Sequence, residues 1–194
     1  MTINACQFTT PVGPLVVLAD ESDNESTVVA AGWCAADELW ERLPAGMKGD
    51  QMSPNEVERL GSAHEPIVAY LNGSVEALAA VPVQQAGTDL QQQVWEGLRQ
   101  IPPGETRNYR ELAEATSKPK AIRAVGSACG RNLIAPMVPC HRALRSDGSL
   151  GGYYYGLEVK QWLLAHEGVR SEATSNANSD KLTLRTEREA GNEG

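Results

Sequence analysis

A cysteine directly followed by a histidine is the feature of this sequence with the clearest chemical meaning. Cys140 and His141 lie in a Pro-Cys-His-Arg run. A thiolate is a strong nucleophile, and a nearby imidazole can accept the thiol proton. Adjacent side chains on a strand point to opposite faces, so proton transfer between these two needs a turn or a bridging water. The pair predicts an activated thiol; the alternative is a free cysteine packed as a small core residue.

Glu167 is the second candidate for a chemical role. It falls at the end of the last predicted helix, which starts at Leu157 and is followed by Gly168. The negative end of the helix dipole disfavours a carboxylate there. A specific partner would offset that cost, and a histidine is the obvious candidate. The alternative is a surface carboxylate without a role.

Three short helices are predicted ahead of the cysteine. Capping boxes at residues 88–91 and 108–111 each predict a helix start. The second of these helices covers residues 109–116. A third helix begins at Pro119, a residue suited to a first helical position, and runs to about Cys129. The last two helices form a helix-turn-helix pattern.

The helix that ends near Cys129 has two distinct stripes. One stripe is apolar and is predicted to face the core: Ile122, Val125 and Cys129. The neighbouring stripe carries only methyl side chains: Ala121, Ala124 and Ala128. A helix is about 10–12 Å across and a DNA minor groove about 6 Å wide, so only a helix with nearly bare sides could press into that groove and widen it. The alternative is close helix–helix packing through the alanines.

The N-terminal part is predicted to be a small α/β unit. Strands are expected at residues 15–19 and 27–34, and short helices at residues 37–43, capped by Asp37, and from Glu65 onward. The end of the chain is polar and has no apolar period, which is typical of disorder. The predicted organisation is an α/β domain at 1–82, a mainly helical domain at 83–170 and a disordered tail at 171–194.

The charge is distributed unevenly over the 194 residues, whose formal net charge is −8. Residues 1–90 have 3 basic and 13 acidic side chains, a net of −10, whereas residues 91–170 have 11 and 7, a net of +4. The total argues against indiscriminate binding of polyanions, but it leaves room for a local nucleic-acid site on residues 91–170. The alternative is an ordinary solvated surface.

Cysteine usage and hydropathy indicate a soluble protein of a reducing cytoplasm. The four cysteines are too few for a disulfide scaffold, and none forms a Cys-x-x-Cys pair. No apolar run reaches the length of a membrane span, and the N-terminus lacks the basic and apolar regions of a secretion signal.

An ordered set of motifs between about residues 88 and 168 resembles the O6-alkylguanine-DNA alkyltransferases, also called methylated-DNA–protein-cysteine methyltransferases. The start of the chain, Thr10-Pro11-x-Gly13-Pro14-Leu15, is similar to the N-terminal domain of that family, but more loosely. The motifs are Val94-Trp95, Ile101-Pro102-x-Gly104-Glu105-Thr106, Tyr109-x-x-Leu112-Ala113, Lys118-Pro119-Lys120-Ala121-x-Arg123-Ala124-Val125-Gly126, Asn132, Pro139-Cys140-His141-Arg142, Gly151-Gly152-Tyr153 and Lys160-x-Trp162-Leu163-Leu164-x-x-Glu167.

The resemblance implies five catalytic residues. Cys140 would attack the alkyl carbon on guanine O6 in an in-line displacement and keep the alkyl group. His141 would take the thiol proton through a water, and Glu167 would orient and polarise His141. Tyr109 would donate a hydrogen bond or proton to guanine N3. Asn132 would tie the recognition element to the active-site segment.

The resemblance also implies how DNA is held. Arg123 would enter the duplex and fill the space that the flipped base leaves. Apart from the resemblance, three consecutive tyrosines between Gly151-Gly152 and Gly156 cannot all face inward, so Tyr155 is expected at the rim of the base pocket, where it would obstruct larger alkyl groups. The alternative is a solvent-exposed loop aromatic without influence. Further DNA-binding residues are Arg110, Lys118 and Ser146 at phosphates, and Ala121 and Ala124 on the recognition helix. The base pocket would be lined by Cys129, Ala143, Tyr153 and Tyr154.

The implied protein is a single-turnover DNA-repair methyltransferase, because nothing in the motif could hydrolyse the thioether product. Its partner is double-stranded DNA carrying O6-alkylguanine, with O4-alkylthymine as a further possible substrate. It would be a cytoplasmic, nucleoid-associated prokaryotic monomer, with no membrane partner. Its fold would be a ribonuclease-H-like α/β domain followed by a mainly α domain with a helix-turn-helix. No cofactor is expected, and no metal, since only Cys6 and Cys34 are available for the N-terminal zinc of some relatives.

Three other functions fit parts of the sequence. A lesion-binding alkyltransferase-like protein would lack the acceptor cysteine, which is present here. A methylation-sensing transcription factor would need a four-cysteine zinc module, which this sequence lacks. A hydrolase using Cys140 and His141 would turn over repeatedly.

Overall fold

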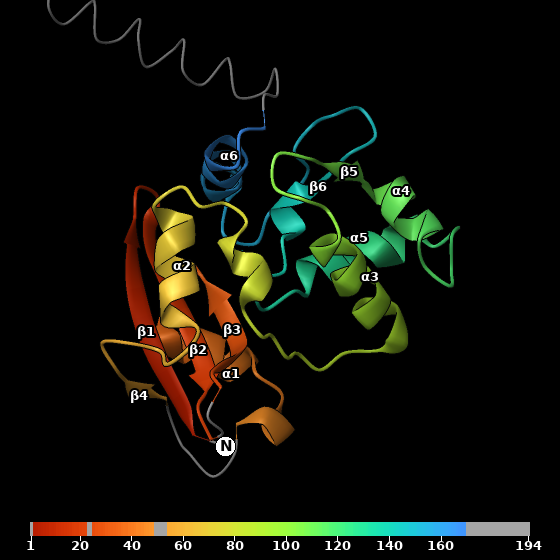
Figure 1. Cartoon of the computed structure of the whole chain (residues 1–194). Helices are drawn as coiled ribbons and strands as arrows, with labels where there is room; N and C mark the ends of the chain where they lie inside the picture. The colour runs from red at the N-terminus through yellow and green to blue at the C-terminus, as the bar shows by residue number, and fades with distance from the viewer. Residues whose placement is uncertain (1, 23–24, 49–53, 170–194) are drawn as a thin grey trace, which may run out of the picture.

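A computed structural model describes residues 2–22, 25–48 and 54–169. The predicted disordered tail, residues 171–194, lies outside the described residues. Among the described residues, the N-terminal half is built around a mixed sheet, and the C-terminal half is mainly helical (Figure 1). No helix within the described ranges is both long and apolar enough to cross a bilayer.

The sheet has the strand order β3-β2-β1-β4. Strands β1 (Ile3–Thr10), β2 (Gly13–Asp20) and β3 (Thr27–Gly32) form an antiparallel meander, and the two-residue β4 (Asn55–Glu56) pairs parallel to β1. The predicted strands correspond to β2 and β3. Strand β1 was not predicted, because polar residues interrupt its apolar pattern; most of its side chains are nevertheless buried, some on each face of the sheet.

Helices cover both faces of this sheet. Helix α1 (Ala36–Arg42) packs Leu39 and Trp40 against one face, and helix α2 (His64–Leu71) packs against the other. Two 3₁₀ turns, Ala45–Met47 and Ala77–Ala80, complete this half. The prediction that Asp37 caps α1 is wrong: the helix starts one residue earlier, so Asp37 lies in the first turn, where its charge suits the dipole.

The C-terminal half joins the sheet along the free edge of β3. The backbone amide of Val28 donates to the carbonyl oxygen of Pro82 at 2.9 Å, as the chain crosses between the halves. Further along β3, the amide of Ala31 donates to Leu133 at 2.7 Å, and its carbonyl accepts from Ala135 at 3.1 Å. One buried core therefore runs through both halves.

The helical half contains α3 (Asp89–Arg99), α4 (Tyr109–Glu114), α5 (Ile122–Gly130) and α6 (Leu157–His166). Both predicted capping boxes are present, at the starts of α3 and α4, so these two helix starts are confirmed. A 3₁₀ turn at Cys140–Arg142 and a small parallel pair of strands, β5 (Arg107–Asn108) and β6 (Ala143–Leu144), position the segment that follows α5.

The start and the core-facing side of α5 differ from the prediction. Pro119 lies in a turn in which the amide of Ala121 donates to Lys118, and the helix begins only at Ile122. Ile122 is 37% exposed rather than buried, because it stands at this first position before the helix packs on α3. Ala128, predicted on the bare stripe, is buried, and its carbonyl accepts a hydrogen bond from the Trp95 indole at 2.9 Å.

Tyr155 holds the loop before α6 against the sheet. Its hydroxyl donates to the carbonyl of Ala31 at 3.2 Å, and its ring covers Gly32 so closely that a Cβ built on this glycine would lie 2.0 Å from the ring. Glycine is thus required at position 32 for packing rather than for backbone conformation.

Substitution Gly32→Ala should therefore destabilise the protein, because the added methyl forces the Tyr155 ring away from β3. We expect a loss of about 1–3 kcal/mol in the free energy of unfolding, measured by denaturant titration. Gly46→Ala is the matched control, since a Cβ at Gly46 meets no atom of the described residues within 4 Å. Equal stabilities of the two variants would contradict the close packing.

Candidate active site

The Cys140–His141 pair lies in a 3₁₀ turn rather than on a strand. The turn is closed by a hydrogen bond from the amide of Arg142 to the carbonyl of Pro139 at 3.0 Å. Cys140 is half-buried, whereas His141 is completely buried. The turn supplies the bend that the sequence analysis required for these neighbours to share one site.

Glu167 is the partner of His141. The Nε2–H of His141 donates to Glu167 Oε1 at 2.9 Å, and both side chains are inaccessible to solvent. Arg142 adds two charge-assisted hydrogen bonds, from Nε to Oε2 at 2.8 Å and from a terminal nitrogen to Oε1 at 2.9 Å. The predicted Glu167–His141 contact is thus present, and Arg142 is a further partner of this carboxylate that no sequence pattern indicated.

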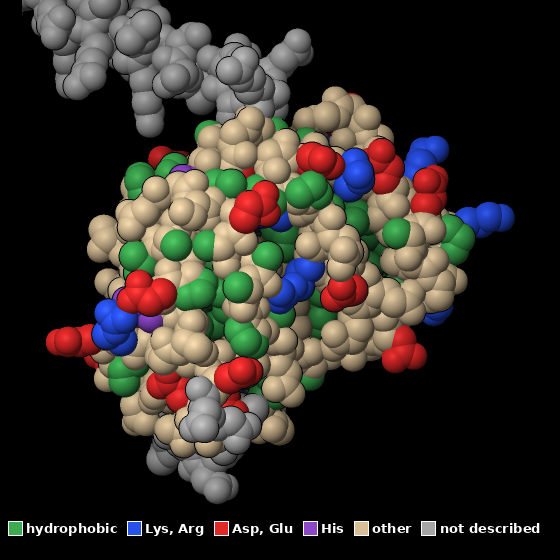
Figure 2. Space-filling model, viewed as in Figure 1, with side chains coloured by type: hydrophobic (Ala, Val, Ile, Leu, Met, Phe, Trp, Pro, Cys, Tyr) green, Lys and Arg blue, Asp and Glu red, His purple; other side chains and the backbone are tan. Residues whose placement is uncertain are grey.

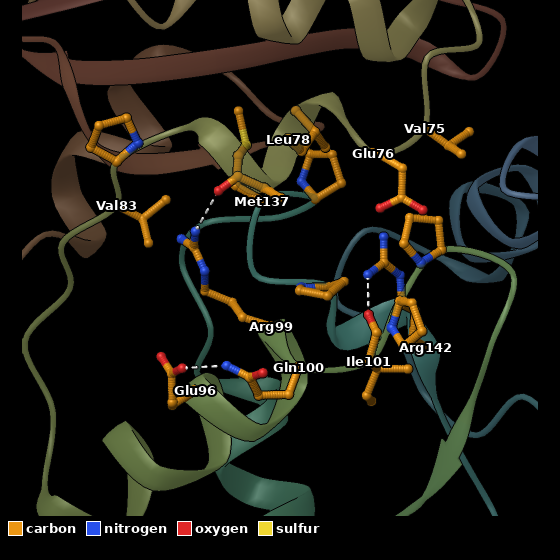
Figure 3. Close-up of a pocket in the computed structure, with 16 residues that line it drawn as sticks. Val75, Glu76, Leu78, Val83, Glu96, Arg99, Gln100, Ile101, Met137 and Arg142 are labelled. Atoms are coloured by element: carbon orange, nitrogen blue, oxygen red, sulfur yellow. Dashed lines mark hydrogen bonds between the residues drawn. The ribbon is translucent and has the colours of Figure 1, made fainter.

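Arg142 is also held on its far side. A terminal nitrogen donates to the carbonyl of Ile101, as the dashed line in Figure 3 shows. This side of Arg142 borders a cavity of about 690 Å³ between the two halves, which Cys140 does not line. There Arg99 donates to the carbonyl of Ala79 at 3.2 Å, and Gln100 to Glu96 at 2.7 Å (Figure 3). The cavity thus lies behind the turn that carries Cys140.

The surroundings set the charges of this pair. Burial alone would raise the pKa of Glu167, but His141 and Arg142 together lower it to about 2. Burial lowers the pKa of His141 despite the opposing effect of Glu167, so the imidazole is neutral near pH 7. With its proton on Nε2, the other nitrogen, Nδ1, is an acceptor; it is buried and has no partner among the described residues.

Asn132 connects the end of α5 to the cysteine turn. Its amide nitrogen donates to the carbonyl of Val138 at 2.7 Å and to the Cys140 sulfur at 3.2 Å. Its oxygen accepts from the amide of Ile134 at 3.0 Å and from Gln85 at 3.2 Å. These contacts place the Cys140 thiol beside Asn132, shortly after the end of α5.

Lys160 is a buried cation that the sequence analysis did not single out, although it lies in one of the quoted motifs. Its ammonium donates to the carbonyl of Ala143 at 2.7 Å and also to Leu150. Burial lowers its pKa to about 8. Burial also raises the pKa of Cys140, while Asn132 and Lys160 oppose this effect, so the resting thiol keeps its proton.

The Cys140 sulfur opens into a cavity of about 320 Å³. The predicted lining residues Cys129, Tyr153 and Tyr154 all border it, and so does Tyr109. Ala143 does not: it is completely buried beside Lys160, so its assignment to the pocket wall is wrong. The buried hydroxyl of Tyr153 lies beside the Cys140 thiol, and its interaction with that sulfur is among the effects that oppose the burial-induced rise in the pKa of Cys140.

The tyrosine run forms a wall that the N-terminal half holds in place. Arg42 of α1 donates to the Tyr155 hydroxyl at 3.3 Å and stacks over the Tyr154 ring at 3.8 Å. The Tyr154 hydroxyl donates to Glu38 at 3.2 Å. The predicted position of Tyr155 at the rim is therefore corrected: it lies between the pocket and β3, whereas Tyr154, 56% exposed, is the outer tyrosine.

The predicted DNA-binding side chains lie at the surface of the helical half. Arg110, Lys118 and Ser146 are exposed, and so is Arg123 on α5. Lysine and arginine side chains project where α4 and the following loop form an edge of the molecule, with acidic side chains among them (Figure 2). On α5, Ala124 is exposed, whereas Ala121, just before the helix, is half-buried.

Within the described parts of the chain, no cluster of three or more histidine, cysteine or acidic side chains is arranged to hold a metal ion. Cys6 and Cys34 both border one groove on the N-terminal sheet, and both thiols are free.

Comparison with known proteins gives consistent matches. A family profile described as 6-O-methylguanine DNA methyltransferase, DNA binding domain, matches residues 89–169. A methylated-DNA–protein-cysteine methyltransferase of Shigella flexneri is 34% identical over 163 residues, which are 84% of this chain and 94% of that protein.

Solved structures show the same similarity across both halves. The crystal structure of the Mycobacterium tuberculosis O6-methylguanine methyltransferase is 31% identical with a TM-score of 0.66, covering 89% of this chain and 96% of that one. The structure of M. tuberculosis OGT in complex with DNA is 29% identical with a TM-score of 0.63, covering 88% and 98%. These neighbours combine a mixed sheet with helices, as this chain does.

Glu167 should make stability depend on pH in acid. Its pKa is about 2 in the folded protein and ordinarily near 4.5, so its contribution is complete above pH 4.5 and is lost as the pH falls towards 2. The free energy of unfolding of wild type should therefore lose about 3 kcal/mol relative to Glu167→Gln between pH 6 and pH 2. Glu158→Gln, an exposed position on α6, is the control and should follow wild type at every pH.

Proposed function

The chain belongs to the methylated-DNA–protein-cysteine methyltransferase family, and on this premise we propose that Cys140 accepts the alkyl group from O6-alkylguanine in DNA. The activity is DNA repair by direct transfer of the group to a cysteine. One observation supports this assignment most strongly. The half-buried thiol of Cys140 opens into a cavity. In the next residue, His141, the buried Nδ1 has no partner among the described residues and can accept a proton, while Nε2 is hydrogen-bonded to the carboxylate of Glu167.

The transfer is an in-line displacement. The Cys140 sulfur forms a bond to the alkyl carbon as the bond from that carbon to guanine O6 breaks, and the electron pair passes to the guanine. His141 Nδ1 receives the thiol proton through a water, while Glu167 stabilises the imidazolium that forms. Tyr109 protonates or hydrogen-bonds guanine N3; burial, with Cys129 and Cys140, raises its pKa, so it keeps its proton for this role.

The product explains a single turnover. A thioether carbon–sulfur bond is not activated for hydrolysis, so each protein molecule repairs one lesion. The same chemistry applies to O4-alkylthymine if that base fits the pocket.

The substrate is double-stranded DNA from which the damaged base is flipped. Helices α4 and α5 act as a helix-turn-helix, and Ala121 and Ala124 leave the recognition helix narrow enough to approach the groove. Arg123 fills the gap in the duplex. Arg110, Lys118 and Ser146 contact phosphates, and Cys129, Tyr153 and Tyr154 line the pocket for the base.

The proposed organisation is a ribonuclease-H-like domain at residues 1–82 and an alkyltransferase domain at residues 83–170. The protein acts as a monomer in the cytoplasm, next to the nucleoid.

Substitution Cys140→Ser tests the acceptor. A serine hydroxyl is far from ionised at neutral pH, so we expect binding of the lesion to persist and transfer to be lost. The measurement is intact mass after incubation with duplex DNA carrying O6-methylguanine: wild type gains one methyl group and the variant none. Cys34→Ser is the control and should react like wild type. Transfer by Cys140→Ser at the wild-type rate would overturn the assignment.

Substitution Arg123→Ala tests base flipping. Its role is to hold the flipped state, so repair of a methylated duplex should slow by about tenfold or more, whereas reaction with the free base O6-benzylguanine should change little. Single-turnover rates on both substrates provide the comparison, with Arg59→Ala on the N-terminal half as the control. Equal losses on the two substrates would contradict the role.

A further inference from the structure

Tyr70 connects the N-terminal half directly to the catalytic carboxylate. It lies on α2, is completely buried, and donates its hydroxyl hydrogen to Glu167 Oε1 at 2.9 Å across 97 residues of sequence. Burial and the charge of Glu167 raise the pKa of Tyr70 well above its ordinary value. The hydroxyl therefore stays protonated and acts as a donor to this carboxylate.

The position of Tyr70 is fixed by its main chain as well. The Nε2–H of His166, the last residue of α6, donates to the carbonyl of Tyr70 at 2.7 Å. The Tyr70 and His166 rings meet edge to face with centroids 5.0 Å apart, and His166 also stacks on Trp162 with centroids 5.0 Å apart. In Figure 1, α2 and α6 lie side by side at this contact. These contacts fix the position of the Tyr70 hydroxyl beside Glu167.

Glu167 Oε1 accepts three hydrogen bonds, from His141, Arg142 and Tyr70. Each donor reduces the negative charge that this oxygen presents to the imidazole. Removal of the Tyr70 donor would leave a more basic oxygen, which favours the protonated imidazolium even before substrate is bound. An imidazolium has no acceptor nitrogen and so cannot take the thiol proton.

We propose that Tyr70 is a positioning residue for the transfer reaction: its hydroxyl holds Glu167 and limits its basicity, so that His141 keeps a free acceptor nitrogen. The inference rests on the proposed function, in which His141 receives the thiol proton. It makes the N-terminal half a contributor to catalysis through a single hydroxyl group. The charged groups around His141 in this arrangement are Glu167, Arg142 and Lys160, and those around the Tyr70 hydroxyl are Glu167 and Arg142.

Substitution Tyr70→Phe removes this hydroxyl and keeps the ring. We expect single-turnover transfer from a methylated duplex at pH 7 to slow by about tenfold, which corresponds to the loss of roughly one net hydrogen bond, with unchanged DNA affinity. The acid limb of the pH–rate profile should also move to higher pH, because the imidazole becomes easier to protonate. In a Glu167→Gln background, Tyr70→Phe should add little further loss.

Ile67→Val is the matched control, since Ile67 is a completely buried residue of the same helix in the same core. It should lower stability without moving the acid limb. An unchanged rate and profile in Tyr70→Phe would overturn the inference, and so would a shift of the same size in Ile67→Val. Failure of the proposed function is a separate result, in which wild type itself gains no alkyl group on Cys140.

Discussion

The buried carboxylate of Glu167 is the group on which the arrangement of the site depends. An isolated carboxylate in a protein interior costs several kcal/mol, so a folded structure must surround it with donors. Here a guanidinium, an imidazole and a phenol do so, and they come from the cysteine turn and from α2. The carboxylate is satisfied only when these two elements and the end of α6 are docked together, so docking and assembly of the site are the same event.

This compensation sets protonation states that suit the proposed transfer to Cys140. Glu167 remains ionised, His141 is neutral with its proton directed at the carboxylate, and the Cys140 thiol keeps its proton in the resting protein. Because the thiolate and not the thiol is the reactive form, the resting sulfur is protected from unwanted electrophiles. In the next residue, His141, the Nδ1 atom is buried without a hydrogen-bond partner among the described residues, and the proposed transfer uses this nitrogen as the proton acceptor.

The pocket wall shows the same dependence on both halves. Tyr154 and Tyr155 belong to the loop before α6, but Arg42 and Glu38 of α1 hold them from the N-terminal side. The absence of a side chain on Gly32 allows Tyr155 to lie against β3. The shape of the pocket is thus decided by contacts between residues more than 100 positions apart, which no local pattern records.

The sequence by itself determined the local features. The capping boxes placed the starts of α3 and α4, because backbone capping depends on residue types at short spacing, and the ordered motifs between about residues 88 and 168 indicated the family. Only the tertiary structure decided the rest: that Ile122 is exposed, that Tyr155 faces β3, and that Arg142 and Tyr70 share the carboxylate of Glu167. The physical reason is that burial and charge compensation depend on which surfaces folding brings together. A hydrogen bond between two residues that are 97 positions apart cannot be recognised from a local or periodic pattern in the sequence.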